Sequence, residues 1–194
     1  MSELVRSFVA VDVSDGARRQ IAGLLDGLRR QGPTGVRWVK PDLMHLTLAF
    51  LGEVEPEFIE ACRAQLAPAV AQFSRFTAQL SGLGAFPDAA RARVVWTGME
   101  QGRDEVCALQ RGVLKALVRA GFVPERRPFS PHLTLGRLRE PADVTRVTKV
   151  GFESEPFAID RVTLFRSDLG PGGPTYSRIA EFELPGTQLD NRPV

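Results

Sequence analysis

Two periods of hydrophobic and polar residues follow one another along the chain. Residues 4–13 (LVRSFVAVDV) alternate in the way of a strand. Apolar residues then recur at helical spacing from Ser14, a favourable N-cap residue, to Gly32, which with the following proline favours the end of a helix. The helical period returns over residues 55–73 and 103–120, so the sequence predicts three helices.

Extended segments separate and follow these predicted helices. Turn residues in LGPGGPT (169–175) favour a hairpin between the last two segments over an anion-binding nest. The order of elements, without a low-complexity linker, predicts an α+β fold with a mostly antiparallel sheet in one domain, residues 1–194, ending in a frayed tail at 186–194. The extended segments are expected within residues 36–52 and at 74–83, 91–97, 129–138, 157–165 and 176–184.

A ten-residue pattern occurs twice. Residues 44–53 read MHLTLAFLGE and residues 131–140 read PHLTLGRLRE, with His, Leu, Thr, Leu, Leu and Glu in one register. The repeats contain both histidines of the chain, His45 and His132. Each repeat follows a predicted helix and a short extended segment, so we expect two pseudo-symmetric lobes, each presenting one copy.

The faces of the two repeated strands differ in character. Side chains alternate along a strand, so the histidine and threonine of HLTL lie on one face and both leucines on the other. If the leucines pack on the core of each lobe, His45, Thr47, His132 and Thr134 remain on the opposite faces. Pairing of the lobes about a pseudo-twofold axis would then bring two imidazoles and two hydroxyls to one site.

This set of groups fits phosphodiester chemistry. One neutral and one protonated histidine can activate a nucleophile and protonate a leaving oxygen in a single displacement. Threonine hydroxyls can donate hydrogen bonds to the phosphate oxygens. A zinc site is a poorer interpretation because neither repeat offers a thiolate or carboxylate ligand beside its histidine, and no GxSxG motif indicates a serine nucleophile. We therefore expect no metal requirement.

Composition sets wider bounds. A formal net charge of +2 permits an anionic substrate without demanding nucleic acid. Cys62 and Cys107 fall in predicted helices with no CxxC spacing and are expected to be buried free thiols. No apolar run reaches membrane-spanning length and the N-terminal segment does not have the pattern of a signal peptide, so a cytoplasmic protein without a membrane partner is expected.

The repeats and their flanks resemble a known family. The paired HLTL motifs are typical of the two-histidine phosphoesterases, and more closely of the bacterial and archaeal RNA 2′,3′-cyclic phosphodiesterases, first described as 2′-5′ RNA ligases. Family-like stretches cover nearly the whole chain in family order: residues 6–13, 38–54, 129–137 and 164–184. The resemblance implies a bilobal α+β fold with antiparallel sheets lining a central cleft, helices outside and no cofactor.

The resemblance also implies roles for individual residues. His45 would be the general acid, His132 the general base, and Thr47 and Thr134 would bind phosphate oxygens. The implied reaction opens a terminal 2′,3′-cyclic phosphate on RNA, or on a small cyclic nucleotide, to a 2′-phosphate, and ligation is the related reaction. A monomer is expected.

Further residues are candidates for contacts with the substrate. Arg137 fits the family pattern but lies, by strict alternation, on the face opposite to His132, so the strand must bend or end there. Tyr176 could stack a base or simply pack, and Phe50 suits the core better than the site. Arg126 and Arg127 could attract RNA or form a solvated pair.

Two other functional interpretations stay open. The chain could be a relative that binds a nucleotide or RNA end without catalysis. It could also be a phosphodiesterase for another substrate, such as ADP-ribose cyclic phosphate or 2′,5′-oligoadenylate.

Overall fold

The computed structural model describes residues 3–125 and 127–186. In these residues, four α-helices and ten β-strands alternate in an α+β arrangement, which confirms the predicted fold class. The helices are α1 (Asp15–Gln31), α2 (Pro56–Val70), α3 (Arg103–Arg119) and α4 (Thr145–Thr148), with a 3₁₀ turn, η1 (Pro41–Leu43). The strands are β1 (Val5–Asp12), β2 (Val36–Trp38), β3 (His45–Val54), β4 (Phe76–Ala78), β5 (Leu80–Phe86), β6 (Ala92–Met99), β7 (Leu133–Ala142), β8 (Phe157–Ile159), β9 (Arg161–Gly170) and β10 (Gly173–Glu183).

Eight of the strands form one sheet that is antiparallel throughout. Its order is β10-β9-β1-β3-β7-β6-β5, with β2 also paired to β7, while β4 and β8 form a separate two-stranded sheet. The two repeats meet where β3 and β7 pair, at the single position Leu46↔Leu133. We call β10, β9, β1 and β3 the His45 half and β7, β6, β5 and β2 the His132 half. These halves correspond to the two expected lobes.

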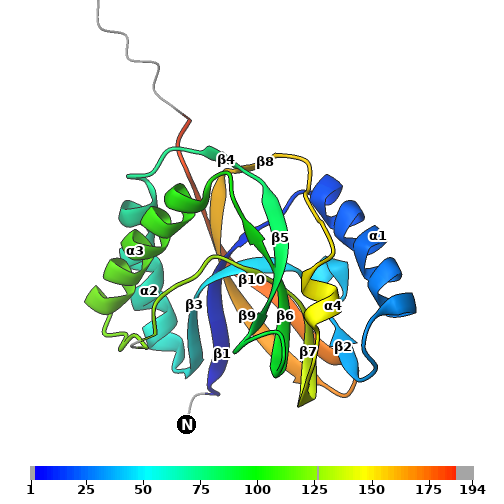
Figure 1. The fold of residues 1–194 in the computed structure, drawn as a ribbon. Helices are drawn as coiled ribbons and strands as arrows, with labels where there is room; N and C mark the ends of the chain where they lie inside the picture. The colour runs from blue at the N-terminus through cyan, green and yellow to red at the C-terminus, as the bar shows by residue number, and fades with distance from the viewer. Residues whose placement is uncertain (1–2, 126, 187–194) are drawn as a thin grey trace, which may run out of the picture.

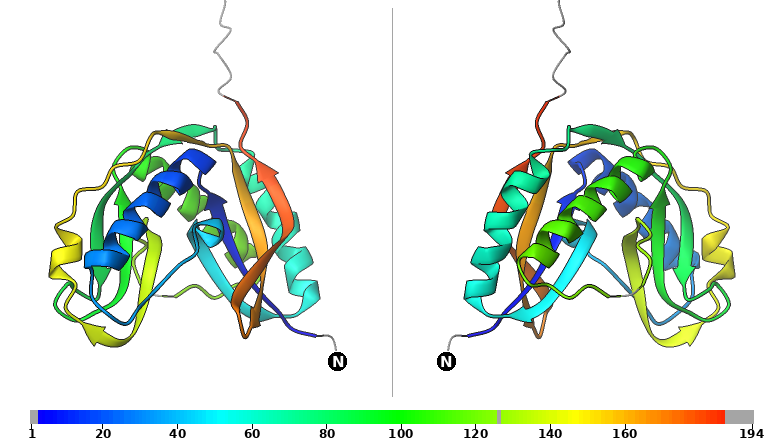
Figure 2. Two further views of the ribbon diagram at one scale, coloured as in Figure 1. Left: turned by 90° about the vertical axis from the view of Figure 1, so that its right-hand side faces the viewer. Right: turned by 90° about the vertical axis from the view of Figure 1, so that its left-hand side faces the viewer.

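The helices flank the sheet on two sides. Figure 1 shows α2 and α3 together on one side of the molecule and α1 and α4 on the other. The views in Figure 2 show that the strands and helices together form an arch, with β4 and β8 across its top. One continuous core of buried residues, including Ile21, Leu66, Leu117, Leu46 and Leu133, lies between the helices and the sheet. This core holds the backbones of both repeats in place.

Local signals in the sequence set the ends of the helices. Ser14 lies at the N-cap of α1, and its hydroxyl oxygen accepts a hydrogen bond from the Ala17 amide at 3.1 Å, as its residue type predicts. α3 stops before Gly121, whose positive φ of 102° suits glycine at a helix C-terminus. α2 extends two residues beyond Pro68 to Val70, so this proline lies in the last turn, where little of the helix is left to disrupt.

The structure divides two of the predicted strands. Residues 74–83 split at Gln79 into β4 and β5, because β4 pairs with β8 whereas β5 pairs with β6 and extends to Phe86. Residues 157–165 split at Asp160 for the same reason, since β9 pairs with β1 and β10. β9 and β10 form the predicted hairpin. Of the predicted tail, only Gly186 lies within the described residues.

The two cysteines differ in burial. Cys62 in α2 is buried, and burial raises the pKa of its thiol to about 11. Cys107 in α3 is only half-buried, so the prediction of two buried thiols is wrong for this residue. Both thiols are free.

Candidate active site

The two histidines flank the one position that joins the halves of the sheet. His45 directly precedes Leu46 and His132 directly precedes Leu133, and both leucines are fully buried, as predicted. The histidines and the threonines two residues later are only partly buried. Because the strands are antiparallel, His45 lies on the side of Thr134, and Thr47 on the side of His132. The two HLTL motifs thus present their polar side chains around one centre.

A β-bulge follows the threonine in each motif. In β3, Thr47 pairs with Ala10 and Ala49 with Val9, which leaves Leu48 as an extra residue. In β7, Thr134 pairs with Trp96 and Gly136 with Val95, which leaves Leu135 as the extra residue. An extra residue resets the alternation of side chains along the rest of the strand.

The bulges decide the positions of Phe50 and Arg137. After the reset, both residues lie on the same face as the histidine and threonine of their motif, and at equivalent positions of the two repeats. Phe50 is 56% exposed, so the prediction that it belongs to the core is wrong. Arg137 reaches the histidine face through the bulge, which is the bend that strict alternation required.

Each imidazole is oriented by a backbone carbonyl two residues earlier. Nδ1 of His45 lies 2.9 Å from the oxygen of Leu43, and Nδ1 of His132 lies 2.8 Å from the oxygen of Ser130. A carbonyl oxygen can only accept, so Nδ1 is the donor and carries the proton in both neutral rings. Nε2 is therefore left as the nitrogen that can accept or deliver a proton during a reaction.

Aromatic side chains surround His45. Its ring stacks on Phe8 with centroids 4.6 Å apart and meets the edge of Tyr176 at 5.3 Å. Phe8, Ala10 and Phe165 form a second small apolar cluster with Tyr176 packed against it. Phe50 lies 6.0 Å from Phe8, between ring centroids. Tyr176 therefore packs beside His45, and its position remains compatible with a contact to a base.

Different aromatic residues surround His132. Its ring meets the Phe86 ring at 5.0 Å in an edge-on arrangement, and Trp96 lies 6.3 Å away, both between centroids. A side chain at Gly84 would collide with the Trp96 indole, so glycine makes room for that ring. The Arg127 guanidinium lies over Phe86, 5.2 Å from the ring centre. Arg126, the other arginine of the pair considered from the sequence, lies outside the described residues.

Burial and positive charge make both histidines weak bases. Burial lowers the pKa of His45 to about 4; the hydrogen bond to Leu43 opposes this shift, and the positive charges of Arg18 and Arg137 reinforce it. Burial likewise lowers the pKa of His132, against the bond to Ser130, with Arg137 and Arg127 contributing. Both rings are therefore neutral at neutral pH in the free protein.

Arg137 is the charge that the two histidines share. Its guanidinium lowers the pKa of both, and it also opposes the effect of burial, which raises the pKa of Tyr176. Within residues 3–125 and 127–186, no carboxylate forms an ion pair with Arg137. An unpaired guanidinium beside two imidazoles favours an anionic ligand.

Sequence reasoning singled out Phe50 and Tyr176 but missed other aromatic residues around the two rings, among them Phe8, Phe86 and Trp96. Phe8 and Trp96 lie on predicted strands, and Phe86 lies three residues beyond the predicted strand at 74–83, but no register was available to place them. The same holds for Arg18, whose contacts depend on the path of α1 over the 3₁₀ turn.

Neither a metal site nor a membrane span is found in the part of the chain that the structure describes. No group of three or more His, Cys, Asp or Glu side chains there is arranged to hold a metal ion. No helix among those residues is long and apolar enough to cross a membrane.

Comparison with known proteins agrees with this arrangement. A family model described as LigT like Phosphoesterase matches residues 11–96 and 98–176. The RNA 2′,3′-cyclic phosphodiesterase of Archaeoglobus fulgidus is 37% identical over 186 residues, covering 92% of this chain and 100% of the relative. The enzyme of that name from Thermotoga maritima is 32% identical over 184 residues, covering 94% and 97%. The crystal structure of Escherichia coli LigT complexed with 3′-AMP has a TM-score of 0.78 at 31% identity, covering 94% and 99%.

Fold, paired motifs and comparisons define the class as two-histidine phosphoesterases. The chain belongs to the LigT-like phosphoesterase family.

Proposed function

We propose that this protein is an RNA 2′,3′-cyclic phosphodiesterase that opens a terminal cyclic phosphate to a 2′-phosphate by paired-histidine acid–base catalysis. The observation that carries the proposal is the pair of imidazoles, each with Nδ1 on a carbonyl oxygen and Nε2 left for proton transfer, on either side of one strand junction. The names of the relatives in Archaeoglobus fulgidus and Thermotoga maritima support the substrate. The E. coli complex with 3′-AMP supports a nucleotide at the site.

The proposed reaction is an in-line displacement at phosphorus. Nε2 of His132 takes a proton from water as the water oxygen bonds to phosphorus. The bond from phosphorus to the 3′-oxygen breaks, and Nε2 of His45 delivers its proton to that oxygen. The products are a 3′-hydroxyl and a 2′-phosphate. Each proton transfer contributes roughly 10²–10⁴-fold in rate. A 5′-hydroxyl in the place of water would instead give a 2′-5′ linkage.

His45 has to take up a proton from solvent when the substrate binds. A pKa of about 4 leaves the free ring neutral at neutral pH. The phosphodiester carries a negative charge, and an opposite charge nearby raises the pKa of an imidazole. Substrate binding therefore favours protonation of His45. Because the imidazole of His45 is a weak base, its protonated form gives up the proton readily when the 3′-oxygen leaves.

The remaining residues divide between phosphate and base. Thr47 and Thr134 lie on the histidine face of their strands, where their hydroxyls can donate to non-bridging phosphate oxygens. Arg137 adds a positive charge whose influence reaches both histidines. Phe50 and Tyr176, in the His45 half, offer aromatic surface for stacking a nucleobase. The proposal includes a monomer without metal or cofactor.

A product analysis tests the proposal. RNA hexamers ending in a 2′,3′-cyclic phosphate, cyclic mononucleotides, ADP-ribose cyclic phosphate and 2′,5′-oligoadenylate are each incubated with the protein in excess EDTA, and 2′- and 3′-phosphate products are resolved by chromatography. We expect 2′-phosphate from the hexamer, undiminished by EDTA. Loss of turnover in EDTA with recovery in zinc or manganese would contradict the acid–base assignment. Binding without turnover on every substrate would identify a binding relative.

A further inference from the structure

Arg18 of α1, a residue outside the repeats, donates hydrogen bonds to three other residues. Nη1 donates to the carbonyl oxygen of Pro41 at 2.7 Å, and Nε donates to the carbonyl oxygen of Val13 at 3.2 Å. Nη2 lies 3.1 Å from Oδ1 of Asp12, and the Arg18 side chain is only 16% exposed. The guanidinium thereby joins the end of β1, the start of α1 and the 3₁₀ turn η1.

The turn that Arg18 holds is the turn that orients His45. Pro41–Leu43 forms η1, in which the amide of Met44 donates to the Pro41 oxygen at 3.0 Å. The Leu43 carbonyl at the end of this turn accepts the hydrogen bond from Nδ1 of His45. A displacement of η1 would move that carbonyl and release the ring from its fixed tautomer and direction.

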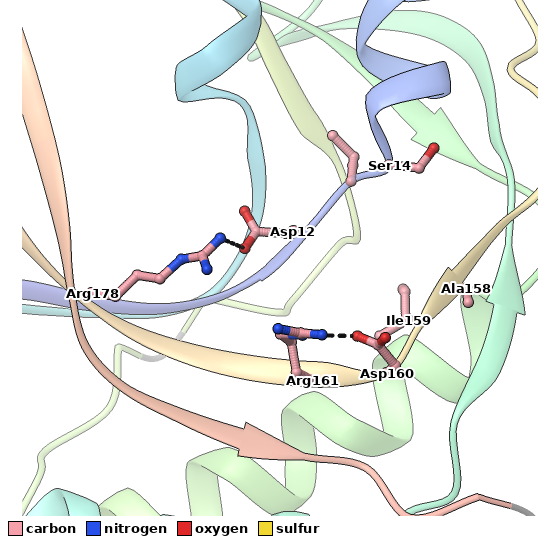
Figure 3. Close-up of a pocket in the computed structure, with 8 residues that line it drawn as sticks. Asp12, Ser14, Ala158, Ile159, Asp160, Arg161 and Arg178 are labelled. Carbon is pink, nitrogen blue, oxygen red and sulfur yellow. Dashed lines mark hydrogen bonds and ion pairs between the residues drawn. The ribbon is translucent and has the colours of Figure 1, made fainter.

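Asp12 fixes the direction of the Arg18 guanidinium. It is the last residue of β1 and the direct cross-strand partner of His45. Its other oxygen, Oδ2, lies 3.2 Å from Nη2 of Arg178 on β10. Figure 3 shows this contact beside a pocket of about 320 Å³ lined by Asp12, Ser14, Ile159, Asp160, Arg161 and others. Neither histidine lines that pocket.

His132 has no comparable support. Its Nδ1 donates to Ser130, which lies in an extended segment without a helical turn. Within the described residues, no side chain other than that of His132 itself donates a hydrogen bond to the backbone of 128–131. The hydrogen bond from Arg18 to the turn before the histidine therefore belongs to one repeat alone. Such a bond cannot be a general requirement for placing a histidine before an HLTL strand.

We propose that Arg18, directed by Asp12, is a positioning residue for His45: it holds the Pro41–Leu43 turn so that the Leu43 carbonyl keeps the proton on Nδ1 and Nε2 toward the substrate. Arg18 touches neither substrate nor reacting atoms in this role. The inference rests on the proposed catalytic use of His45 only for its effect on rate, because the orientation of the ring can be measured without turnover.

The test compares Arg18→Met, Arg18→Lys and Asp12→Asn with Arg19→Met, a control at the adjacent, exposed position of the same helix. ¹⁵N NMR of the imidazoles reports which nitrogen carries the proton, and the chain has only two histidines, so His132 is an internal reference in every spectrum. We expect Arg18→Met to convert His45 from the Nδ1–H form to a mixture of tautomers, while His132 stays unchanged. Arg18→Lys, with one donor group, should keep part of the wild-type signal.

Kinetics on the cyclic-phosphate hexamer complete the test. We expect Arg18→Met to lower kcat by about 10- to 100-fold, the scale of a displaced catalytic group, with KM changed little. Arg18→Lys and Asp12→Asn should lose less, and Arg19→Met nothing. An unchanged His45 tautomer in folded Arg18→Met and Asp12→Asn would overturn the proposal, as would an equal change at His132. If His45→Ala retained full activity, the proposed function would fail while the tautomer result stood.

Discussion

The two halves of the site have the same backbone and different neighbours. Both present a histidine held by the carbonyl two residues earlier, a threonine on the same face, and a bulge that brings a further side chain beside them. That further side chain is Phe50 in one half and Arg137 in the other. Repetition thus explains where the reactive groups lie, whereas the residues that differ between the repeats explain how the halves can take different roles.

The difference extends to the support of the rings. His45 stacks on Phe8, which in turn packs against Phe165 and Tyr176, and its turn is held by the partly buried Arg18. His132 meets Phe86 edge-on, next to the exposed guanidinium of Arg127. An imidazole that packs among aromatic rings and has its pKa lowered to about 4 suits the proposed acid, which takes up a proton when the substrate binds and releases it to the leaving oxygen. Each of the following experiments bears on this division of roles.

The largest expected effect separates acid from base. His45→Ala and His132→Ala should each lower kcat for the natural substrate by about 10²–10⁴-fold. On a nitrophenyl phosphodiester the leaving group needs no proton, so His45→Ala should recover most of its loss and His132→Ala little. Steady-state rates of both variants on both substrates measure this. Recovery of His132→Ala alone would show that the two roles are reversed, and equal losses would contradict the division.

A smaller effect separates phosphate from base recognition. Arg137→Gln should lower kcat/KM about 10-fold or more, with a salt dependence weaker by one phosphate contact, a slope change of about 0.7. Phe50→Ala should raise KM for nucleotides by the equivalent of about 1–3 kcal/mol of stacking, with an unchanged salt slope. Rates between low and moderate salt check both. The same salt slope in the two variants would mean that the halves do not divide phosphate and base.

The smallest effect concerns protons. The acid must be protonated, so activity falls as pH rises through the pKa of His45, and the base must be neutral, so activity falls as pH drops through the pKa of His132. The pKa of about 4 for His45 applies to the free protein, and bound phosphate raises it by about 1–3 units. The high-pH limb of the kcat/KM profile should therefore lie at lower pH than the high-pH limb of the kcat profile. If the high-pH limbs of the measured kcat/KM and kcat profiles coincide, substrate binding does not raise the pKa of His45 as proposed.

Denaturation supplies the matching control without substrate. Because the pKa of His45 falls from 6.5 to about 4 on folding, the unfolded chain binds the proton more readily. His45 should contribute stability that is fully present above pH 6.5 and is lost as pH falls toward 4. His45→Asn should flatten the fall in unfolding free energy over that window, as measured by urea titration at several pH values.

The sequence predicted the parts that depend on local periodicity. Alternation placed His45, Thr47, His132 and Thr134 opposite the buried leucines, and helical spacing with an N-cap residue located α1. These inferences need no knowledge of the partner strand. The fold class follows from the same patterns, since it depends on the order of elements and not on their register.

The failures come from contacts between distant segments. The prediction that Phe50 belongs to the core fails because a bulge at Leu48 resets the alternation and brings this side chain to the exposed face. A bulge depends on pairing with β1, and no residue of β3 announces it. The strand predicted over 74–83 is interrupted at Gln79 because β4 and β5 have different partners. The hydrogen bond from Arg18 to the Pro41 carbonyl joins α1 to η1 and likewise has no local signal in the sequence.

The single pair Leu46↔Leu133 sets the register between the two strands that carry the proposed active site. The relative position of the two HLTL strands depends on that pair, because no other residues of β3 and β7 are partners in the register of the sheet. A slip of one residue at this point would turn one repeat over and bring leucines to the substrate in place of histidine and threonine. Leu46 and Leu133, both fully buried in the common core, therefore hold the strand register on which the proposed active site depends.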